Sequence, residues 1–173
     1  MLGHFLTKHP AIYDTIMEII DEYRAVVNEY NKSVGIQDIA ARLMRPDDQV
    51  IGAAAETYSD TYTNATDEYL RSAAAALRVP VGQGVLHLGW YCDIDLGADG
   101  ILQVNLEGIK RQEIAARWAF QGEWHIYLEP QQIVFAREND KIGFIVHNAA
   151  GRDMVGVAYP FAFIIGPRKQ LLV

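Results

Sequence analysis

The sequence predicts a mainly β protein, with an antiparallel sandwich or barrel in the C-terminal half and helical segments before it. From residue 82 onward, apolar side chains recur with a period of two, and turn signals interrupt them roughly every 8 to 12 residues. The first eighty residues instead have an alanine-rich, acidic, helix-favouring background. We therefore expect a single domain over residues 1–173, in which 1–80 are a largely helical or mixed extension and 81–173 form the β-barrel core.

Size and composition exclude several classes of protein. The chain has 173 residues, of which half are hydrophobic, so it can bury a core of its own and is neither disordered nor collagen-like. Cys92 is the single cysteine, which excludes an internal disulfide framework. We expect no signal peptide at the start and no integral membrane segment, since the longest apolar run, residues 157–165, is about half of what a spanning helix needs.

The charge distribution argues against direct binding to nucleic acid. The formal net charge is -7, divided into -5 over residues 1–80 and -2 over the remainder. An acidic chain gains nothing from counterion release on a phosphate backbone. The paired bases, Lys110-Arg111 and Arg168-Lys169, lack the further positive charge that a nucleic-acid groove requires.

Residues 11–31 form the clearest helical pattern. Pro10 precedes it, apolar residues recur at spacings of three and four from Ile12 to Tyr30, and residues 32–35 end it. The opposite face is acidic and is expected to be solvated. The apolar face either covers the sheet of its own domain or docks onto a second copy of the chain.

The rest of the front half is more ambiguous. A shorter helical pattern covers residues 36–44 and ends at a turn signal, and residues 50–58 fit a helix while the adjoining 57–63 have the composition of a strand. Asn64 or Thr66 is a candidate cap for a helix that runs to Leu77 and closes at Val79-Pro80.

Strands account for the back half of the chain. Residues 85–92 are apolar on both faces and are expected to pair through an Asp-Gly hairpin turn with 101–106. Further strands are predicted over 114–120, 124–128, 132–136, 142–147 and 154–165. In the last strand, large residues from Val155 to Ile165 share the face expected in a core, and the small residues of the other face can lie close under another layer, a helix or a neighbouring subunit.

No motif indicates catalysis, and we predict no catalytic, cofactor-binding or metal-binding residue. Gly82-x-Gly84 is followed by a strand where a phosphate loop needs a helix, and Asp93, Asp95 and Asp99 lack the spacing of a calcium loop. His4, His9, His87, His125 and His147 never form a paired metal motif, although three of them lie in separate strands and could meet in space. Cys92 is expected to be an ordinary core thiol.

The C-terminal strands resemble a known family. The pattern comprises residues 129–135, the polar turn 138–140, Ile142-x-Phe144-x-Val146-x-Asn148, a small-residue turn, the aromatic strand 155–161 and Gly166-x-Arg168. It is similar to the last strands of viral jelly-roll proteins. The size and organisation of the whole chain resemble the small major capsid proteins of tailless, internal-membrane phages of Thermus, which are built from a single vertical β-barrel.

The resemblance implies a jelly roll and a capsid subunit in the virion. Such a subunit self-associates, usually as a dimer, and tiles an icosahedral shell with a second, larger capsid protein above a lipid layer. An eight-stranded barrel would have to recruit strands from the first eighty residues, which leaves the strand order open.

These observations lead to three hypotheses about function. The leading hypothesis is a non-enzymatic, self-assembling structural protein that buries apolar surface against copies of itself, with a C-terminal tail that either frays or reaches a neighbour or anionic lipid headgroups. The second is a carbohydrate-binding or small-ligand module that presents Trp90, Trp118 and Trp124. The third is a barrel enzyme with a histidine-bound metal.

Overall fold

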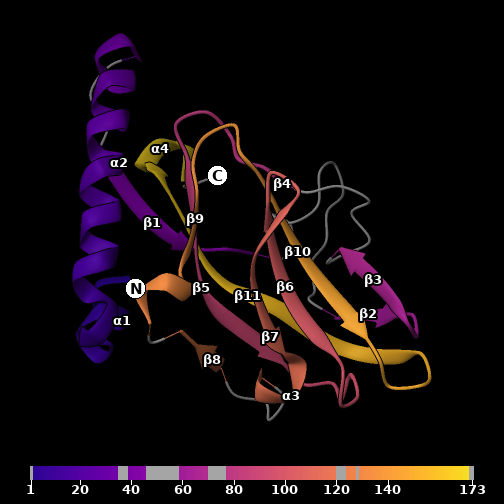
Figure 1. Cartoon of the computed structure of the whole chain (residues 1–173). Coiled ribbons are helices and arrows are strands. Elements are labelled where there is room, and N and C mark those ends of the chain that lie inside the picture. The colour runs from indigo at the N-terminus through magenta and orange to yellow at the C-terminus, as the bar shows by residue number, and fades with distance from the viewer. Residues whose placement is uncertain are drawn as a thin grey trace.

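The computed structural model describes residues 2–34, 39–45, 59–69, 77–119, 124–127 and 129–171. It confirms a mainly β fold in which two antiparallel sheets face each other and helices lie at the N-terminal side (Figure 1). The helical elements are α1 (Leu2–Lys8), η1 (Pro10–Ile12), α2 (Tyr13–Val34), α3 (Ala116–Ala119), η4 (Pro130–Gln132) and α4 (Arg168–Leu171). The strands are β1 (Ile39–Leu43), β2 (Ser59–Tyr62), β3 (Thr66–Tyr69), β4 (Leu77–Arg78), β5 (Gly84–Cys92), β6 (Ile101–Leu106), β7 (Ile109–Ala115), β8 (Trp124–Ile126), β9 (Val134–Ala136), β10 (Lys141–Asn148) and β11 (Met154–Pro167).

The order of the described strands is that of a jelly roll. The first sheet runs β1-β11-β5-β8, with β2 also on β11 and β9 also on β5, and the second runs β3-β10-β6-β7, with β4 also on β10. β1 and β2 pair with opposite ends of β11, β8 and β9 with opposite ends of β5, and β3 and β4 with opposite ends of β10. The two short strands of each pair therefore occupy one position in their sheet. Each sheet thus has four positions, and the chain visits the eight positions in jelly-roll order.

The predicted hairpin between residues 85–92 and 101–106 is wrong, although both strands exist. β5 lies in the first sheet and β6 in the second, so the loop between them crosses from one sheet to the other. Leu96 anchors this crossing in the core and Gly97 makes its turn with a φ of 84°. The Asp-Gly signal identified a turn correctly, but a turn signal does not specify which strand the chain pairs with afterwards.

The front half supplies strands where helices were predicted. The helical patterns over residues 36–44 and 64–77 are wrong within the described residues, which form β1, β3 and β4. β1 is a strand because its backbone pairs with β11, from Ile39 opposite Pro167 to Leu43 opposite Phe163. This sheet pairing outweighs a weak local preference for helix. Residues 59–62 fit the strand alternative, and 50–58 lie outside the described residues.

Strand boundaries in the back half follow the predictions with one exception. The strand expected over residues 114–120 begins earlier, at Ile109, and ends at Ala115, where the short helix α3 takes over. Strands β8, β9, β10 and β11 all overlap the ranges predicted for them.

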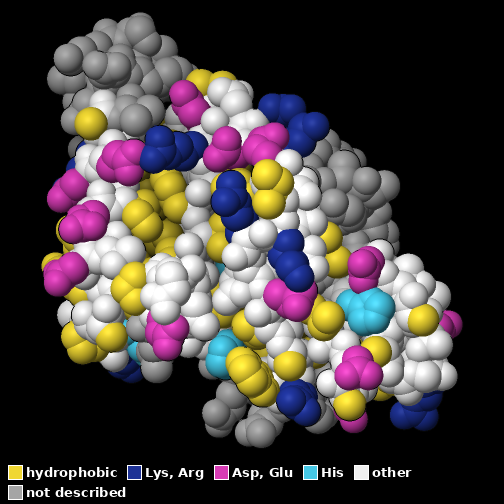
Figure 2. Space-filling view, in the orientation of Figure 1, with side chains coloured by type: hydrophobic (Ala, Val, Ile, Leu, Met, Phe, Trp, Pro, Cys, Tyr) yellow, Lys and Arg dark blue, Asp and Glu magenta, His cyan; other side chains and the backbone are white. Residues whose placement is uncertain are grey.

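The N-terminal helices cover the outer face of the first sheet. α2 confirms the predicted helix and lies along one side of the sandwich (Figure 1). Its buried side chains pack on the helix-facing side chains of β5 and β11. This cluster contains Ile12, Ile16, Ile20 and Tyr23 from the helices and Leu86, Leu88, Phe163 and Ile165 from the strands. The apolar helix face therefore covers its own sheet. Acidic side chains line the opposite, solvated edge (Figure 2). None of the described helices is long and apolar enough to cross a membrane.

The two faces of β11 have the predicted composition but not the predicted placement. The small face, with Ala158 and Ala162, looks into the core between the sheets, whereas Phe161 and Phe163 of the large face contact the helix layer. Small residues suit the inner face because Trp90 and Phe144 occupy the space between the sheets. Val155, at the start of the strand, is 70% exposed.

A β-bulge in β5 changes which side chains enter the barrel. Phe161 lies opposite Gly89 and Ala162 opposite His87, so Leu88 has no partner on β11. Before the bulge the odd-numbered residues face the interior, and after it the even-numbered ones do, so His87 and Trp90 both point inward. Gly89 is required here because a Cβ atom would lie 2.1 Å from the carbonyl oxygen of His125.

We expect Ile16→Ala to lower the free energy of unfolding by about 2–5 kcal/mol, because Ile16 is fully buried between α2 and the first sheet. Denaturant unfolding measures this loss. Glu18→Ala, at an exposed position of the same helix, is the control and should change stability by less than about 0.5 kcal/mol. Equal stabilities of the two variants would show that α2 does not dock on this sheet.

Candidate functional site

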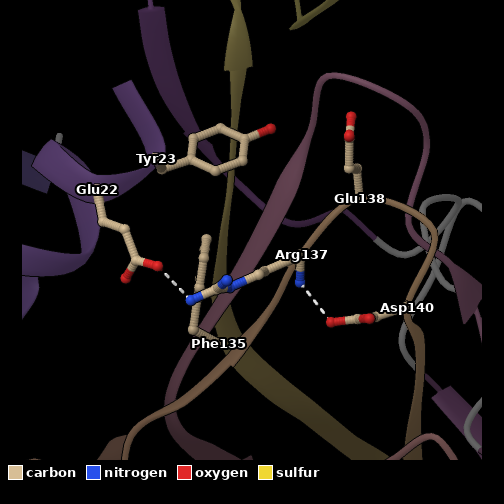
Figure 3. A pocket seen from close by; sticks show the side chains of 6 residues that line it. All are labelled: Glu22, Tyr23, Phe135, Arg137, Glu138 and Asp140. Atoms are coloured by element: carbon tan, nitrogen blue, oxygen red, sulfur yellow. Dashed lines mark hydrogen bonds and ion pairs between the residues drawn. The ribbon is translucent and has the colours of Figure 1, made fainter. Parts of the chain in front are cut away.

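A pocket of about 270 Å³ opens where α2 meets the turn between β9 and β10 (Figure 3). Glu22 and Tyr23 enter it from the helix, and Phe135 enters from the middle of β9. The turn contributes the remaining lining residues, Arg137, Glu138 and Asp140. Residues that are more than a hundred positions apart in sequence therefore form one site.

Local hydrogen bonds shape the turn that forms one wall. The backbone N–H of Arg137 donates to the Asp140 carboxylate at 2.8 Å, and Asn139 adopts a left-handed conformation with a φ of 68°. The N–H of Asn139 also donates to the carbonyl oxygen of Val79 at 2.9 Å. The polar turn predicted over residues 138–140 is confirmed, and these bonds fix its side chains over the helix.

The pocket is rich in negative charge. Its three carboxylates, on Glu22, Glu138 and Asp140, face one cation, Arg137. The Arg137 guanidinium pairs with Glu22, and because both side chains are more than half exposed the pair contributes little stability. Glu138 accepts a hydrogen bond from the N–H of Gly82 at 2.8 Å. Three carboxylates against one guanidinium give the lining an excess of negative formal charge.

Tyr23 is the buried polar residue of this pocket. Only 3% of the residue is exposed, its ring lies edge-on to Phe135 at 5.7 Å between centroids, and its hydroxyl has no hydrogen-bond partner. Burial, with a further contribution from the Glu138 carboxylate, raises the pKa of Tyr23, so the hydroxyl keeps its proton. The helical stripe predicted that Tyr23 would be buried, but no sequence signal placed it beside residues 135–140.

A second group of buried polar side chains lies inside the barrel. His87 is fully buried, with ring centroids 5.3 Å from Trp90, 5.3 Å from Tyr127 and 5.4 Å from Phe144, and neither ring nitrogen has a hydrogen-bond partner. The indole N–H of Trp90 and the hydroxyl of Tyr127 are also buried without a hydrogen-bond partner. Burial lowers the pKa of His87 to about 3, so the imidazole is neutral at physiological pH.

The other strand histidines lie elsewhere. His125, on β8, lies beside Trp118 and Tyr127, and His147 pairs with Asp67 at 2.6 Å on the outer face of the second sheet. His147 and Asp67 line a pocket of about 240 Å³ there. The side chain of His4 lies outside the described part of the chain. Within that part, no three His, Cys, Asp or Glu side chains are close enough together to hold a metal ion.

The remaining candidates from the sequence have structural surroundings. Asp95 accepts a hydrogen bond from the backbone N–H of Gly97 at 3.0 Å, as expected of an Asx turn. Asp93 instead accepts from the backbone N–H of Val157, on the distant strand β11, at 2.6 Å. Cys92 is fully buried and donates to the carbonyl oxygen of Ile94 at 3.3 Å, and burial raises the pKa of its thiol to about 11. It is therefore a core thiol, as predicted.

The three tryptophans do not form one exposed surface. Trp90 is fully buried, so its predicted exposure in a binding module is wrong, whereas Trp118 on α3 is 62% exposed. The side chain of Trp124 lies outside the described residues. At the C-terminus, α4 exposes Arg168 and Lys169 but buries Leu171, so the chain is anchored as far as Leu171 and the predicted fraying is wrong up to that residue.

We expect acid to destabilise the protein through His87. An unfolded histidine has a pKa near 6.5 and the folded His87 a pKa of about 3, so between these values the unfolded state binds the extra proton. The stability of the fold with a neutral, buried His87 is fully present above pH 6.5. Below pH 6.5 the free energy of unfolding falls by up to about 1.4 kcal/mol per pH unit. Urea unfolding between pH 7.5 and 4.5 measures the slope, which His87→Phe should reduce. Equal slopes in the two proteins would contradict this assignment.

Comparison with known proteins adds no relative. No family model matches the chain, and none of the curated proteins matches it at a significant level. The fold and the geometry of the described residues are therefore the basis on which a function can be argued.

Proposed function

We propose that this chain is a structural, self-assembling protein, a viral capsid subunit that forms an icosahedral shell with a second, larger capsid protein. The observation that carries the proposal is the jelly-roll order of the strands, in which all eight positions are occupied. Viral capsid domains use this architecture, and so do lectins and cupins, so the fold alone does not select among them.

Within the part of the chain that the structure describes, side chains fill the barrel interior, which favours a structural role over a ligand-binding one. The cluster between the sheets is a continuous set of buried side chains that includes Trp90, Tyr62 and Tyr127. The two pockets described above both lie outside the barrel, one under α2 and one on the outer face of the second sheet. A barrel that binds a small molecule internally needs a cavity in the space that these large side chains fill here.

The segment that resembles capsid proteins forms the centre of both sheets. β10 is a central strand of the second sheet and β11 of the first, and Asn148 ends β10. The buried Asn148 amide donates to the carbonyl oxygens of Tyr62 and Arg152, at 2.7 and 2.9 Å, and accepts from the N–H of Ala150 at 2.9 Å. This residue thereby organises the turn that carries the chain from one sheet to the other, at the position where the resemblance has a strand that ends in Asn before a small-residue turn.

Assembly would use surfaces other than the one covered by α2. β7 pairs with β6 along one edge, and Ile109 at its start is 58% exposed beside charged Lys110 and Arg111. Repeated contacts of this kind close into symmetric particles. We expect a homodimer, contact with the larger capsid protein, and a virion location; the exposed Arg168-Lys169 pair is suited to anionic lipid headgroups of an internal membrane. The acidic net charge argues against direct nucleic-acid contact.

We expect the purified full chain to form a stable oligomer at micromolar concentration, because a capsid subunit presents self-complementary surfaces. Size-exclusion chromatography with light scattering measures the mass, and electron microscopy of concentrated samples shows any ordered sheets or shells. A strictly monomeric chain at millimolar concentration would contradict the proposal.

Exposed Trp118 favours a second candidate, a carbohydrate-binding module. Its indole lies 6.3 Å from the His125 ring, centroid to centroid, and an exposed aromatic face can stack on a sugar ring. On this alternative, oligosaccharides shift the intrinsic fluorescence of the protein, and Trp118→Phe abolishes the shift while buried Trp90 keeps its emission. Fluorescence unchanged over a sugar panel would remove this candidate.

A further inference from the structure

The pocket between α2 and the β9–β10 turn has features of a binding site that neither the assembly proposal nor the sugar-binding alternative uses. We propose that it binds an organic ammonium ion, the terminal group of a primary alkylamine or of a lysine side chain, held by Tyr23 and Glu138. The proposal stands independently of self-assembly, because the site is built from residues of a single chain.

Charge selects a cation. The lining carries three carboxylates and one guanidinium, and the ion pair with Glu22 already engages that guanidinium. The hydrogen bonds described above engage one oxygen of each carboxylate, namely Glu22 Oε1, Glu138 Oε2 and Asp140 Oδ2. A carboxylate offers two oxygens and about four acceptor positions, so the pocket has acceptor capacity for a further donor, whereas an anion would meet net negative charge.

The Tyr23 hydroxyl supports a bound ligand independently of the charge of the pocket. It is buried and has no hydrogen-bond partner, and the residue that carries it lines the pocket. In Figure 3 the hydroxyl points across the pocket toward the side where Glu138 stands. Buried polar groups in proteins are normally satisfied, so an unpartnered hydroxyl beside a pocket has hydrogen-bonding capacity that a ligand can use. An ammonium group has three N–H donors, which allows it to donate to the Tyr23 oxygen and the Glu138 carboxylate together.

The aromatic rings and the size of the pocket favour an alkylamine over a bare metal ion. Tyr23 and Phe135 lie edge to face, so the wall beside the carboxylates is apolar and can contact methylene groups or the cation itself. A volume of about 270 Å³ is small for a drug-sized ligand and suits a short alkyl chain. Glu22 and Arg137 form an exposed rim through which such a chain can enter.

Equilibrium dialysis of the full-length protein against labelled n-butylammonium and, separately, Nα-acetyl-lysine methylamide tests the proposal at constant ionic strength. We expect saturable binding at one site per chain. Glu138→Gln should weaken it about tenfold or more, because a charge-assisted hydrogen bond is lost. Glu113→Gln, which removes the same charge from distant β7, is the matched control and should leave binding unchanged.

Tyr23→Phe separates a binding role from a structural one. It removes an unpartnered buried hydroxyl, so the unliganded protein should be as stable as the original or more stable, while amine affinity falls at least about threefold. Tighter binding of the lysine derivative supports a lysine of another protein as the natural occupant, and tighter binding of n-butylammonium supports a free amine. Absence of saturable binding by both probes, or affinities that neither substitution changes, would overturn the proposal.

Discussion

The antiparallel pairing of β5 with β11 is the constraint on which the rest of this structure depends. The two strands lie side by side in the first sheet from Ala158 opposite Cys92 to Ile165 opposite Gly84, and each contributes side chains to both hydrophobic clusters. Burying one Leu, Ile or Phe side chain contributes about 1.5–3 kcal/mol, so this pair supports both the sandwich and the helix layer. A one-residue slip would turn every side chain of a strand to the wrong layer, which is why the register is strongly determined.

The bulge at Leu88 is the exception within that pairing, and it determines the polarity of the barrel interior. Because of it, His87 and Trp90 enter the same core and meet Tyr127, leaving several polar atoms buried without partners. Such groups cost stability, whereas the buried Asn148 amide is fully engaged by the turn it organises. The interior thus contains Asn148, whose amide is hydrogen-bonded at the end of β10, and His87, whose lowered pKa makes stability depend on pH.

Docking of α2 has two consequences for function. It covers the apolar area of the first sheet that could otherwise have been buried by a second copy of the chain, so the proposed self-association would have to use other surfaces. It also brings Glu22 and Tyr23 over a turn more than a hundred residues away, which creates the acidic pocket. The same helix therefore closes one candidate interface and opens one candidate binding site.

Sequence patterns predicted those parts of the fold that depend on local physics. The 3.6-residue stripe identified α2, and the two-residue period identified the strands from β5 onward except β7, of which only the last two residues were predicted. Polar turn residues marked most of the strand ends. The patterns failed at β1, β3 and β4, since short segments become strands through the partners they meet. Of the pocket, the sequence predicted a buried Tyr23 and a polar turn at 138–140, but not their contact.

By itself, then, the sequence determined the class of the fold, the long amphipathic helix and the absence of an internal disulfide, because periodicity, composition and cysteine count are properties of the chain alone. Only the tertiary structure decided the strand order, the crossing between β5 and β6, the inward turn of His87 and the joining of α2 to the β9–β10 turn. The first three depend on which distant backbone groups pair, and the last depends on side-chain packing between α2 and the first sheet. Neither kind of contact produces a periodic pattern in the sequence.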